Sequence, residues 1–139
     1  MHDIAPILIA TSAGIVFALG IVHMGYTFFG DKLLPREAAL TAHMQAVSPM
    51  LTRQTTIWRA WVGFNASHSL GAMLFGAVYA NLAIAWPGVL FASPFLLSLG
   101  FVFLAALLAL ARIYWFRVPF RGLLCAIVAY SVALGLHWA

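Results

Sequence analysis

Four long apolar stretches, separated by shorter polar segments, dominate the pattern of hydrophobic and polar positions along the chain. Each stretch reaches the roughly 20 apolar residues that an α-helix needs to cross the hydrocarbon core of a bilayer. A helix satisfies its own backbone hydrogen bonds there. The pattern therefore predicts an all-α integral membrane four-helix bundle, formed as a single four-span domain over residues 1–139. The predicted spans cover residues 4–29, 57–85, 93–116 and 119–138.

The long polar connection between the first two spans, residues 30–56, carries a helical pattern of its own. Pro35 falls where the first turn of a helix tolerates proline. Leu40, Met44 and Val47 give the segment a partly apolar face, which is typical of a helix lying on a membrane surface. We therefore expect a short interfacial helix between the first and second spans.

Two ridges of small residues predict close approach between helices. They are formed by Ala10, Gly14 and Ala18 in the first span and by Gly63, Ser67 and Gly71 in the second. Such ridges serve packing within one subunit or between subunits, and we expect a homo-oligomer.

Composition and charge placement fit the same picture. The chain is 65% hydrophobic and 7% charged, whereas soluble domains carry about 25% charged residues. The net charge of +4 does not indicate nucleic-acid binding, because all seven cations flank the first–second and third–fourth connections. By the positive-inside rule, loops 30–56 and 116–119 face the cytoplasm and both termini face outside. We expect a multi-pass protein of a bacterial-type inner (plasma) membrane, with the lipid bilayer as its partner.

Candidate chemistry centres on Asn65 and His68, which lie about 12 Å and about 17 Å inside the second span at 1.5 Å per residue. His23, Arg112 and Arg121 fall in the same predicted leaflet. A polar side chain left unpaired in lipid costs several kcal/mol, so these groups should face protein. Two interpretations stay open: Asn65 and His68 tie helices together by hydrogen bonds, or they form part of a ligand site.

Haem and metal ions are weaker alternatives. His23 and His68 lie at similar depths and can in principle supply two axial haem ligands, but nothing in their spacing pairs them, so haem is disfavoured. A metal cluster needs three or more ligands. His68 has no histidine three or four residues on, and the spans lack carboxylates, so no metal site is predicted.

The turn between the third and fourth spans is flanked by residues 111–114 (ARIY) and 117–121 (RVPFR), and Tyr130 follows in the fourth span. These residues resemble the same region of the MAPEG superfamily, the membrane-associated proteins of eicosanoid and glutathione metabolism, and the resemblance covers about the second to fourth spans. Family members carry Arg-x-x-x-Asn-x-x-Glu at the start of the second span. This chain has Trp61-x-x-x-Asn65-x-x-His68 at that spacing, so the Asn is kept and the Arg and Glu are replaced. The surrounding stretch, residues 61–71, also resembles one in short bacterial four-span membrane proteins.

The resemblance implies a homotrimer with sites between subunits, and glutathione or another thiol as cofactor. Arg121 would then be the catalytic residue, and Asn65, His68, Arg112 and His23 would bind the cofactor. Loss of the Arg removes a bidentate carboxylate clamp that Trp cannot replace, which argues against ordinary glutathione chemistry. We therefore expect a membrane protein that binds a lipophilic small molecule. If the protein is an enzyme, its activity should resemble that of a glutathione transferase. A non-enzymatic accessory subunit of a membrane complex is the alternative, and a haem or metal protein is the third.

Overall fold

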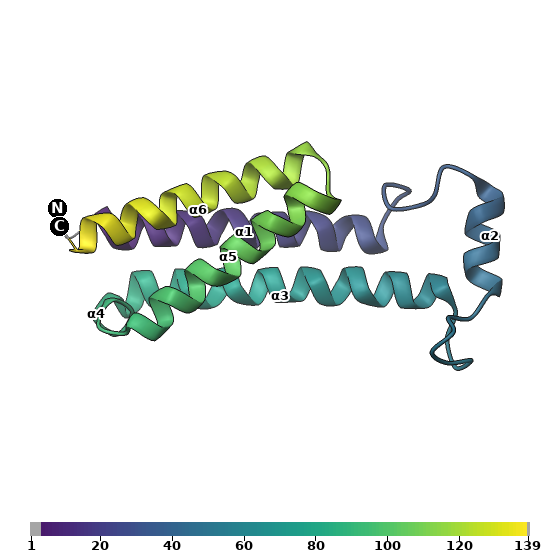
Figure 1. The fold of residues 1–139 in the computed structure, drawn as a ribbon, viewed down its shortest axis with the longest axis horizontal. Helices are drawn as coiled ribbons and strands as arrows, with labels where there is room; N and C mark the ends of the chain where they lie inside the picture. The colour runs from purple at the N-terminus through teal and green to yellow at the C-terminus, as the bar shows by residue number, and fades with distance from the viewer. Residues whose placement is uncertain (1–3, 139) are drawn as a thin grey trace. The chain divides into compact units, whose positions relative to one another are not determined.

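The computed structural model describes residues 4–138, and in that range the regular structure is entirely helical (Figure 1). The helices are α1 (Ile4–Phe28), α2 (Ala38–Ala46), α3 (Ile57–Ala85), α4 (Pro87–Phe91), α5 (Pro94–Tyr114) and α6 (Arg117–Trp138). The predicted positions of the two termini fall partly on residues 1–3 and 139, which lie outside the described residues.

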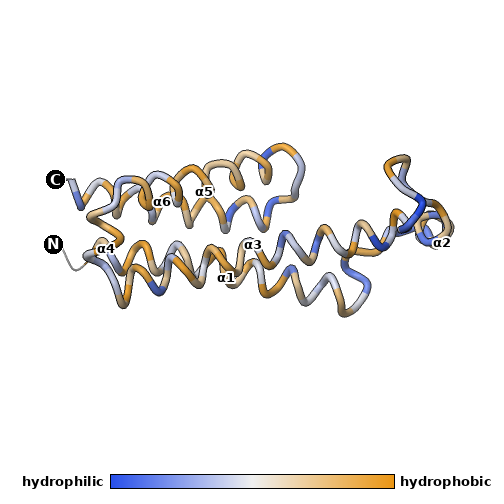
Figure 2. The backbone as a smooth tube through the Cα atoms, turned by 90° about the horizontal axis from the view of Figure 1, so that it is seen from below, coloured by the Kyte–Doolittle hydropathy of each residue, from blue (hydrophilic) through white to orange (hydrophobic). Residues whose placement is uncertain are grey.

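Four of these helices, α1, α3, α5 and α6, are long and apolar enough to cross a membrane. Figure 2 shows apolar colour along most of their length, while hydrophilic positions gather around α2. Large apolar side chains also point outward: Phe64, Leu74 and Phe95 are each at least 66% exposed. Such a surface is unfavourable in water and favourable in lipid. The fold is therefore that of a small multi-pass membrane protein, as the sequence predicts.

Local sequence signals explain where the spans begin. The Thr56 hydroxyl accepts a hydrogen bond from the backbone N–H of Arg59 at 3.3 Å, which caps α3. The Ser93 hydroxyl accepts from the N–H of Leu96 at 3.3 Å, and Pro94 occupies the first turn of α5. These caps lie within one or two residues of the predicted span starts.

One local prediction is wrong. The interfacial segment becomes helical only at Ala38, so Pro35 lies in the irregular backbone before α2 rather than in its first turn. The α3 helix ends at Ala85, as predicted, and the connection after it forms the short helix α4, because Pro87 presets a helical φ and lacks the N–H that a first turn leaves unpaired.

The described residues divide into two compact units: unit 1 comprises residues 4–19 and 72–138, and unit 2 comprises residues 20–71. Unit 1 contains α4, α5 and α6 with the first part of α1 and the last part of α3. Its core is a continuous apolar cluster that includes Ile9, Leu97, Leu104 and Tyr130, each at most 1% exposed.

Glycines permit two close approaches inside unit 1. A Cβ on Gly76 of α3 would lie 2.6 Å from Cβ of Phe17 and 2.7 Å from the Ala13 carbonyl oxygen on α1. A Cβ on Gly100 of α5 would collide with the rings of Tyr130 and Tyr79. Gly76 therefore lets α3 approach the backbone of α1, and Gly100 makes room for the two tyrosine side chains.

The ridges that the sequence favoured are not the ones used in these contacts. Gly14, Gly63 and Gly71 are all exposed, and a Cβ added to any of them would meet nothing within 4 Å. The physical reason is helical phase, because α1 buries Ile9, Ala13 and Val16 on a different face.

Unit 2 contains the end of α1, the whole of α2 and the first half of α3. In Figure 1, α2 runs across the direction of the start of α3 rather than along it. The backbone N–H of Ile57 donates to the Val47 carbonyl at 2.9 Å, which ties the end of α2 to the start of α3. This bond gives the long connection a defined local structure.

Candidate functional site

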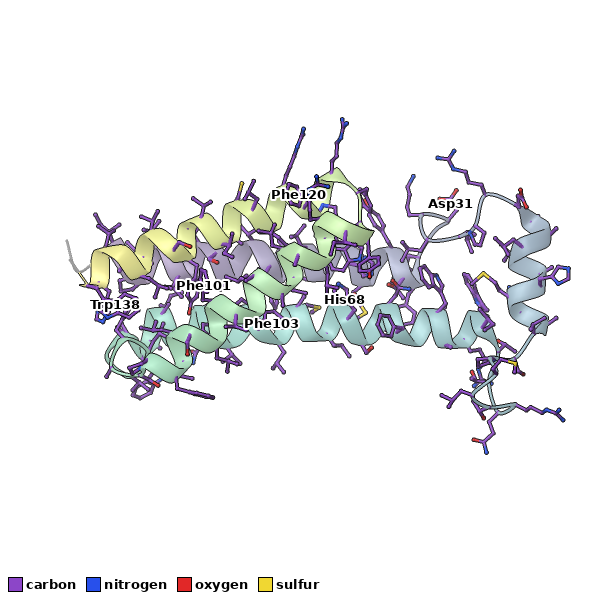
Figure 3. The ribbon with its side chains drawn as sticks, viewed as in Figure 1. Asp31, His68, Phe101, Phe103, Phe120 and Trp138 are labelled. Atoms are coloured by element: carbon purple, nitrogen blue, oxygen red, sulfur yellow. The ribbon has the colours of Figure 1, made fainter. Side chains whose placement is uncertain are left out.

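The polar residues predicted inside the first and second spans do meet in unit 2. His23 lies in the last turns of α1, and Asn65 and His68 lie one turn apart on α3, with His68 projecting from that helix in Figure 3. His23 Nε2 and Asn65 Oδ1 are 2.9 Å apart. The rings of His23 and His68 are in edge contact, with centroids 5.4 Å apart and planes at 88°. We call His23, Asn65 and His68 the polar trio.

Hydrogen-bond chemistry fixes the proton on His23. Asn65 Nδ2 lies 2.8 Å from the Trp61 carbonyl oxygen, which can only accept, so the amide nitrogen must be on that side. Asn65 Oδ1 therefore faces His23 and also can only accept. It follows that His23 Nε2 carries a hydrogen and donates it. In the neutral ring, His23 Nδ1 is then an acceptor, and it makes no hydrogen bond within residues 4–138.

Two neighbouring hydroxyls donate hydrogen bonds to the backbone carbonyls of trio residues on the same helices. The Ser69 hydroxyl is fully buried and donates to the Asn65 carbonyl at 2.9 Å. The Thr27 hydroxyl donates to the His23 carbonyl at 2.8 Å. Asn65 is 8% exposed, whereas both histidines are half-buried. The trio is thus an ordered cluster with partly accessible imidazoles.

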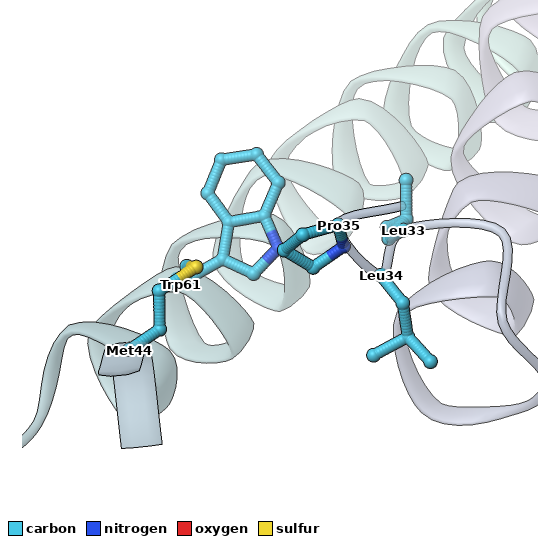
Figure 4. Close-up of a pocket in the computed structure, with 5 residues that line it drawn as sticks. All are labelled: Leu33, Leu34, Pro35, Met44 and Trp61. Carbon is cyan, nitrogen blue, oxygen red and sulfur yellow. The ribbon is translucent and has the colours of Figure 1, made fainter. Parts of the chain in front are cut away.

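Trp61, which bonds to Asn65 through its carbonyl, also lines an apolar hollow. The hollow has a volume of about 320 Å³ and is lined by Leu33, Leu34, Pro35, Met44 and Trp61 (Figure 4). Three segments of unit 2 meet here: the turn after α1, α2 and α3. Trp61 both lines the hollow with its side chain and accepts the Asn65 amide with its carbonyl. Sequence reasoning missed the hollow, although Pro35 and Met44 were visible as apolar positions within a polar connection.

The two arginines proposed as site residues, Arg112 and Arg121, belong to unit 1, where their side chains are exposed near the α5–α6 turn. Cys125, the lone thiol, is also exposed.

A second polar arrangement, in unit 1, is structural. Tyr79 donates to the Leu96 carbonyl at 2.7 Å, and Tyr130 donates to the Leu97 carbonyl at 3.0 Å. Tyr130 is fully buried. Both hydroxyls donate to carbonyls of α5 and so tie α3 and α6 to that helix.

The geometry bears on the haem and metal alternatives. Axial imidazoles approach a haem iron from its two faces, so the porphyrin lies between them. The His23 and His68 rings touch each other edge to face, and in this arrangement a porphyrin does not fit between them. Within residues 4–138, no group of three or more His, Cys, Asp or Glu side chains is placed to hold a metal ion.

The fold and the trio together define the class: a small multi-pass membrane protein with a hydrogen-bonded polar cluster in two of its candidate spans. Comparisons with protein-family models, curated proteins and solved structures find no match. The resemblance to the MAPEG superfamily therefore stays a prediction.

Proposed function

We propose that the protein binds a lipophilic small molecule carrying one polar group. The observation that supports this most is the double role of Trp61, whose side chain lines an apolar hollow of about 320 Å³ and whose carbonyl accepts a hydrogen bond from Asn65 of the trio. Ligand sites commonly combine an apolar wall with a few placed polar groups, in volumes of about 300–1,000 Å³. The hollow is at the lower end of that range, which suits a small or partly exposed ligand.

The trio suggests which polar group the ligand carries. His23 donates through Nε2 to Asn65 and keeps Nδ1 as an acceptor. A hydroxyl or N–H on the ligand is the matching partner. The proposed ligand is therefore an apolar molecule with a hydrogen-bond donor at one end.

The test is to extract the compounds that co-purify with the protein and identify them by mass spectrometry. Met44→Trp fills the hollow and should lower the retained amount several-fold. Leu40→Trp adds the same bulk on the same helix, outside the lining, and should retain the compound at the wild-type level. If both variants retain it equally, or the wild type retains none in stoichiometric amount, the proposal is wrong.

A narrower version adds glutathione or another thiol as cofactor, as the MAPEG resemblance implies. In that version Arg121 stabilises the thiolate by its charge, Asn65 and Arg112 orient the cofactor, and His68 is a polar contact or proton carrier. Glutathione titration and conjugation of an electrophilic aryl halide test it. Arg121→Ala should abolish conjugation, whereas Arg117→Ala, in the same turn, should not. Unchanged conjugation in Arg121→Ala would refute this version alone.

A second candidate, a non-enzymatic accessory subunit of a membrane complex, is favoured by one observation. Both functional atoms of the Asn65 amide are already used within the protein, one on His23 and one on Trp61. That is the behaviour of a tie between helices. Stoichiometric co-purification with one membrane partner, without a bound small molecule, would favour this candidate over the first.

We also propose the topology that the charges favour: loops 30–56 and 116–119 in the cytoplasm and both termini outside a bacterial-type inner membrane. In a Cys125→Ser background, Gln54→Cys should resist a membrane-impermeant maleimide in intact cells and react after lysis. Val89→Cys, in α4 between the second and third spans, should react in both states. The reverse pattern would invert the topology.

A homo-oligomer, a trimer in the MAPEG-like version, completes the proposal. Gly14 and Gly71 on the two small-residue ridges are exposed in the single chain, with nothing within 4 Å of an added Cβ. Native mass spectrometry from a mild detergent measures the copy number. A monomer at all protein concentrations would refute this part.

A further inference from the structure

The connection between α2 and α3 displays two large apolar side chains where a water-exposed turn normally has none. Met50 is 105% exposed and Leu51 is 93% exposed, both relative to a free side chain. Turn centres usually carry Gly, Pro, Asn, Asp or Ser. Contact with water is unfavourable for Met50 and Leu51, so their exposure indicates an apolar partner.

The turn is ordered by its own hydrogen bonds. The backbone N–H of Thr52 donates to the Pro49 carbonyl at 3.2 Å, so Met50 and Leu51 are the two central residues of a turn. The Gln54 N–H donates to the Thr52 hydroxyl at 3.1 Å. At the base of the loop, Ile57 donates to Val47 at 2.9 Å. These bonds close the loop, and Met50 and Leu51, which we call the tip, project outward from it.

Positively charged side chains lie in the same unit as the tip. Unit 2 contains Lys32, Arg36, Arg53 and Arg59, and all four side chains are exposed. Its acidic residues are Asp31 and Glu37, and no ion pair joins them to these cations within residues 4–138. The cationic side chains are therefore available to an anionic partner.

The loop lies next to the start of a helix able to cross a membrane, which points to lipid as its partner. The loop ends directly at Ile57, the first residue of a helix able to cross a membrane, and Trp58 and Arg59 follow as residue types that favour the interface. α2, which leads into the loop, runs across the start of α3 (Figure 1). Only a few residues of chain therefore separate the tip from the headgroup region of the bilayer that α3 is able to cross.

We propose that residues 48–56 form a lipid anchor, in which Met50 and Leu51 enter the bilayer interface and the unit 2 cations bind anionic phospholipid headgroups. Apolar insertion and attraction between cations and anionic lipids act together in surface-bound segments. The anchor is separate from the hollow and the trio, so it goes beyond the proposed ligand binding.

The experiment places one environment-sensitive fluorophore on Leu51→Cys in a Cys125→Ser background and reconstitutes the full chain in vesicles. The two vesicle types are phosphatidylcholine alone and phosphatidylcholine mixed with phosphatidylglycerol, each with doxyl-labelled lipid as quencher. Gln54→Cys, an exposed polar position in the same loop, is the matched control. Because each vesicle has the same composition in both leaflets, the orientation of the inserted protein does not affect the result.

The Leu51 probe should be blue-shifted and quenched several-fold more strongly than the Gln54 probe, and more strongly with phosphatidylglycerol present. Arg36→Gln with Arg53→Gln should remove the phosphatidylglycerol effect while leaving the far-UV circular dichroism spectrum unchanged. Equal quenching in both vesicle types would overturn the anionic-lipid assignment. A Leu51 probe as aqueous as the Gln54 probe would overturn the anchor altogether.

Discussion

The hydrogen bond between His23 and Asn65 joins two candidate spans, and a double-mutant cycle across it measures how far it stabilises the protein. The variants are Asn65→Leu, His23→Leu and the double variant. Leucine has the same branched arrangement of side-chain heavy atoms as asparagine, so the first substitution removes the polar atoms while keeping the side-chain shape. The cycle isolates the pairwise term if neither single variant makes new contacts.

The structure sets the expected magnitude. Asn65 is 8% exposed, so water cannot replace its amide, and Asn65→Leu leaves the His23 Nε2–H without its 2.9 Å partner. A buried donor left unpaired costs about 1–3 kcal/mol. Hydrogen bonds between membrane helices contribute on average about 0.6 kcal/mol and at most about 1.7 kcal/mol. We expect Asn65→Leu to lower the free energy of unfolding by about 1–3 kcal/mol, with a coupling energy of about 1 kcal/mol.

The measurement is equilibrium unfolding in mixed micelles of a mild detergent and dodecyl sulfate, followed by far-UV circular dichroism. Ser67→Ala is the control, because Ser67 is exposed and bonds only to a carbonyl of its own helix, that of Phe64 at 3.0 Å. It should change the free energy of unfolding by less than about 0.5 kcal/mol. Strictly additive effects of the two single variants would show that the His23–Asn65 bond contributes nothing, and the reasoning about the trio would be refuted.

Three further predictions concern packing and protonation. Gly76→Ala, whose Cβ would lie 2.6 Å from α1, should lower the free energy of unfolding by about 1–3 kcal/mol. Gly135→Ala, in α6 and with nothing within 4 Å, should be neutral or stabilising by up to about 1 kcal/mol, and equal thermal midpoints for the two variants would contradict this. Tyr130→Phe should cost about 1 kcal/mol in the same assay, because a fully buried hydroxyl loses its 3.0 Å bond; an unchanged midpoint would speak against that bond. Nitrogen NMR of ring-labelled protein at neutral pH should find the His23 proton on Nε2, and a proton on Nδ1 alone would exclude the arrangement derived from Asn65.

The sequence by itself determined the membrane class and the extent of the spans. Hydrophobic length is a property of a continuous segment, and the signals at the helix starts, such as the Thr56 and Ser93 hydroxyls, act within three residues. Asn65 and His68 could also be singled out in advance, because a polar side chain in an apolar stretch is conspicuous wherever the stretch packs.

Only the tertiary structure decided which groups meet. His23 is separated from Asn65 by 42 positions, and its pairing depends on how the end of α1 packs beside α3 within unit 2. The same holds for glycine, because Gly76 lies against α1 whereas Gly14 and Gly71 face outward, although all three read alike as small residues. The hollow beside Trp61 needs three segments brought together. Spacing along one helix fixes which residues share a face, but helical phase relative to a neighbour is set by packing, and no single segment contains that information.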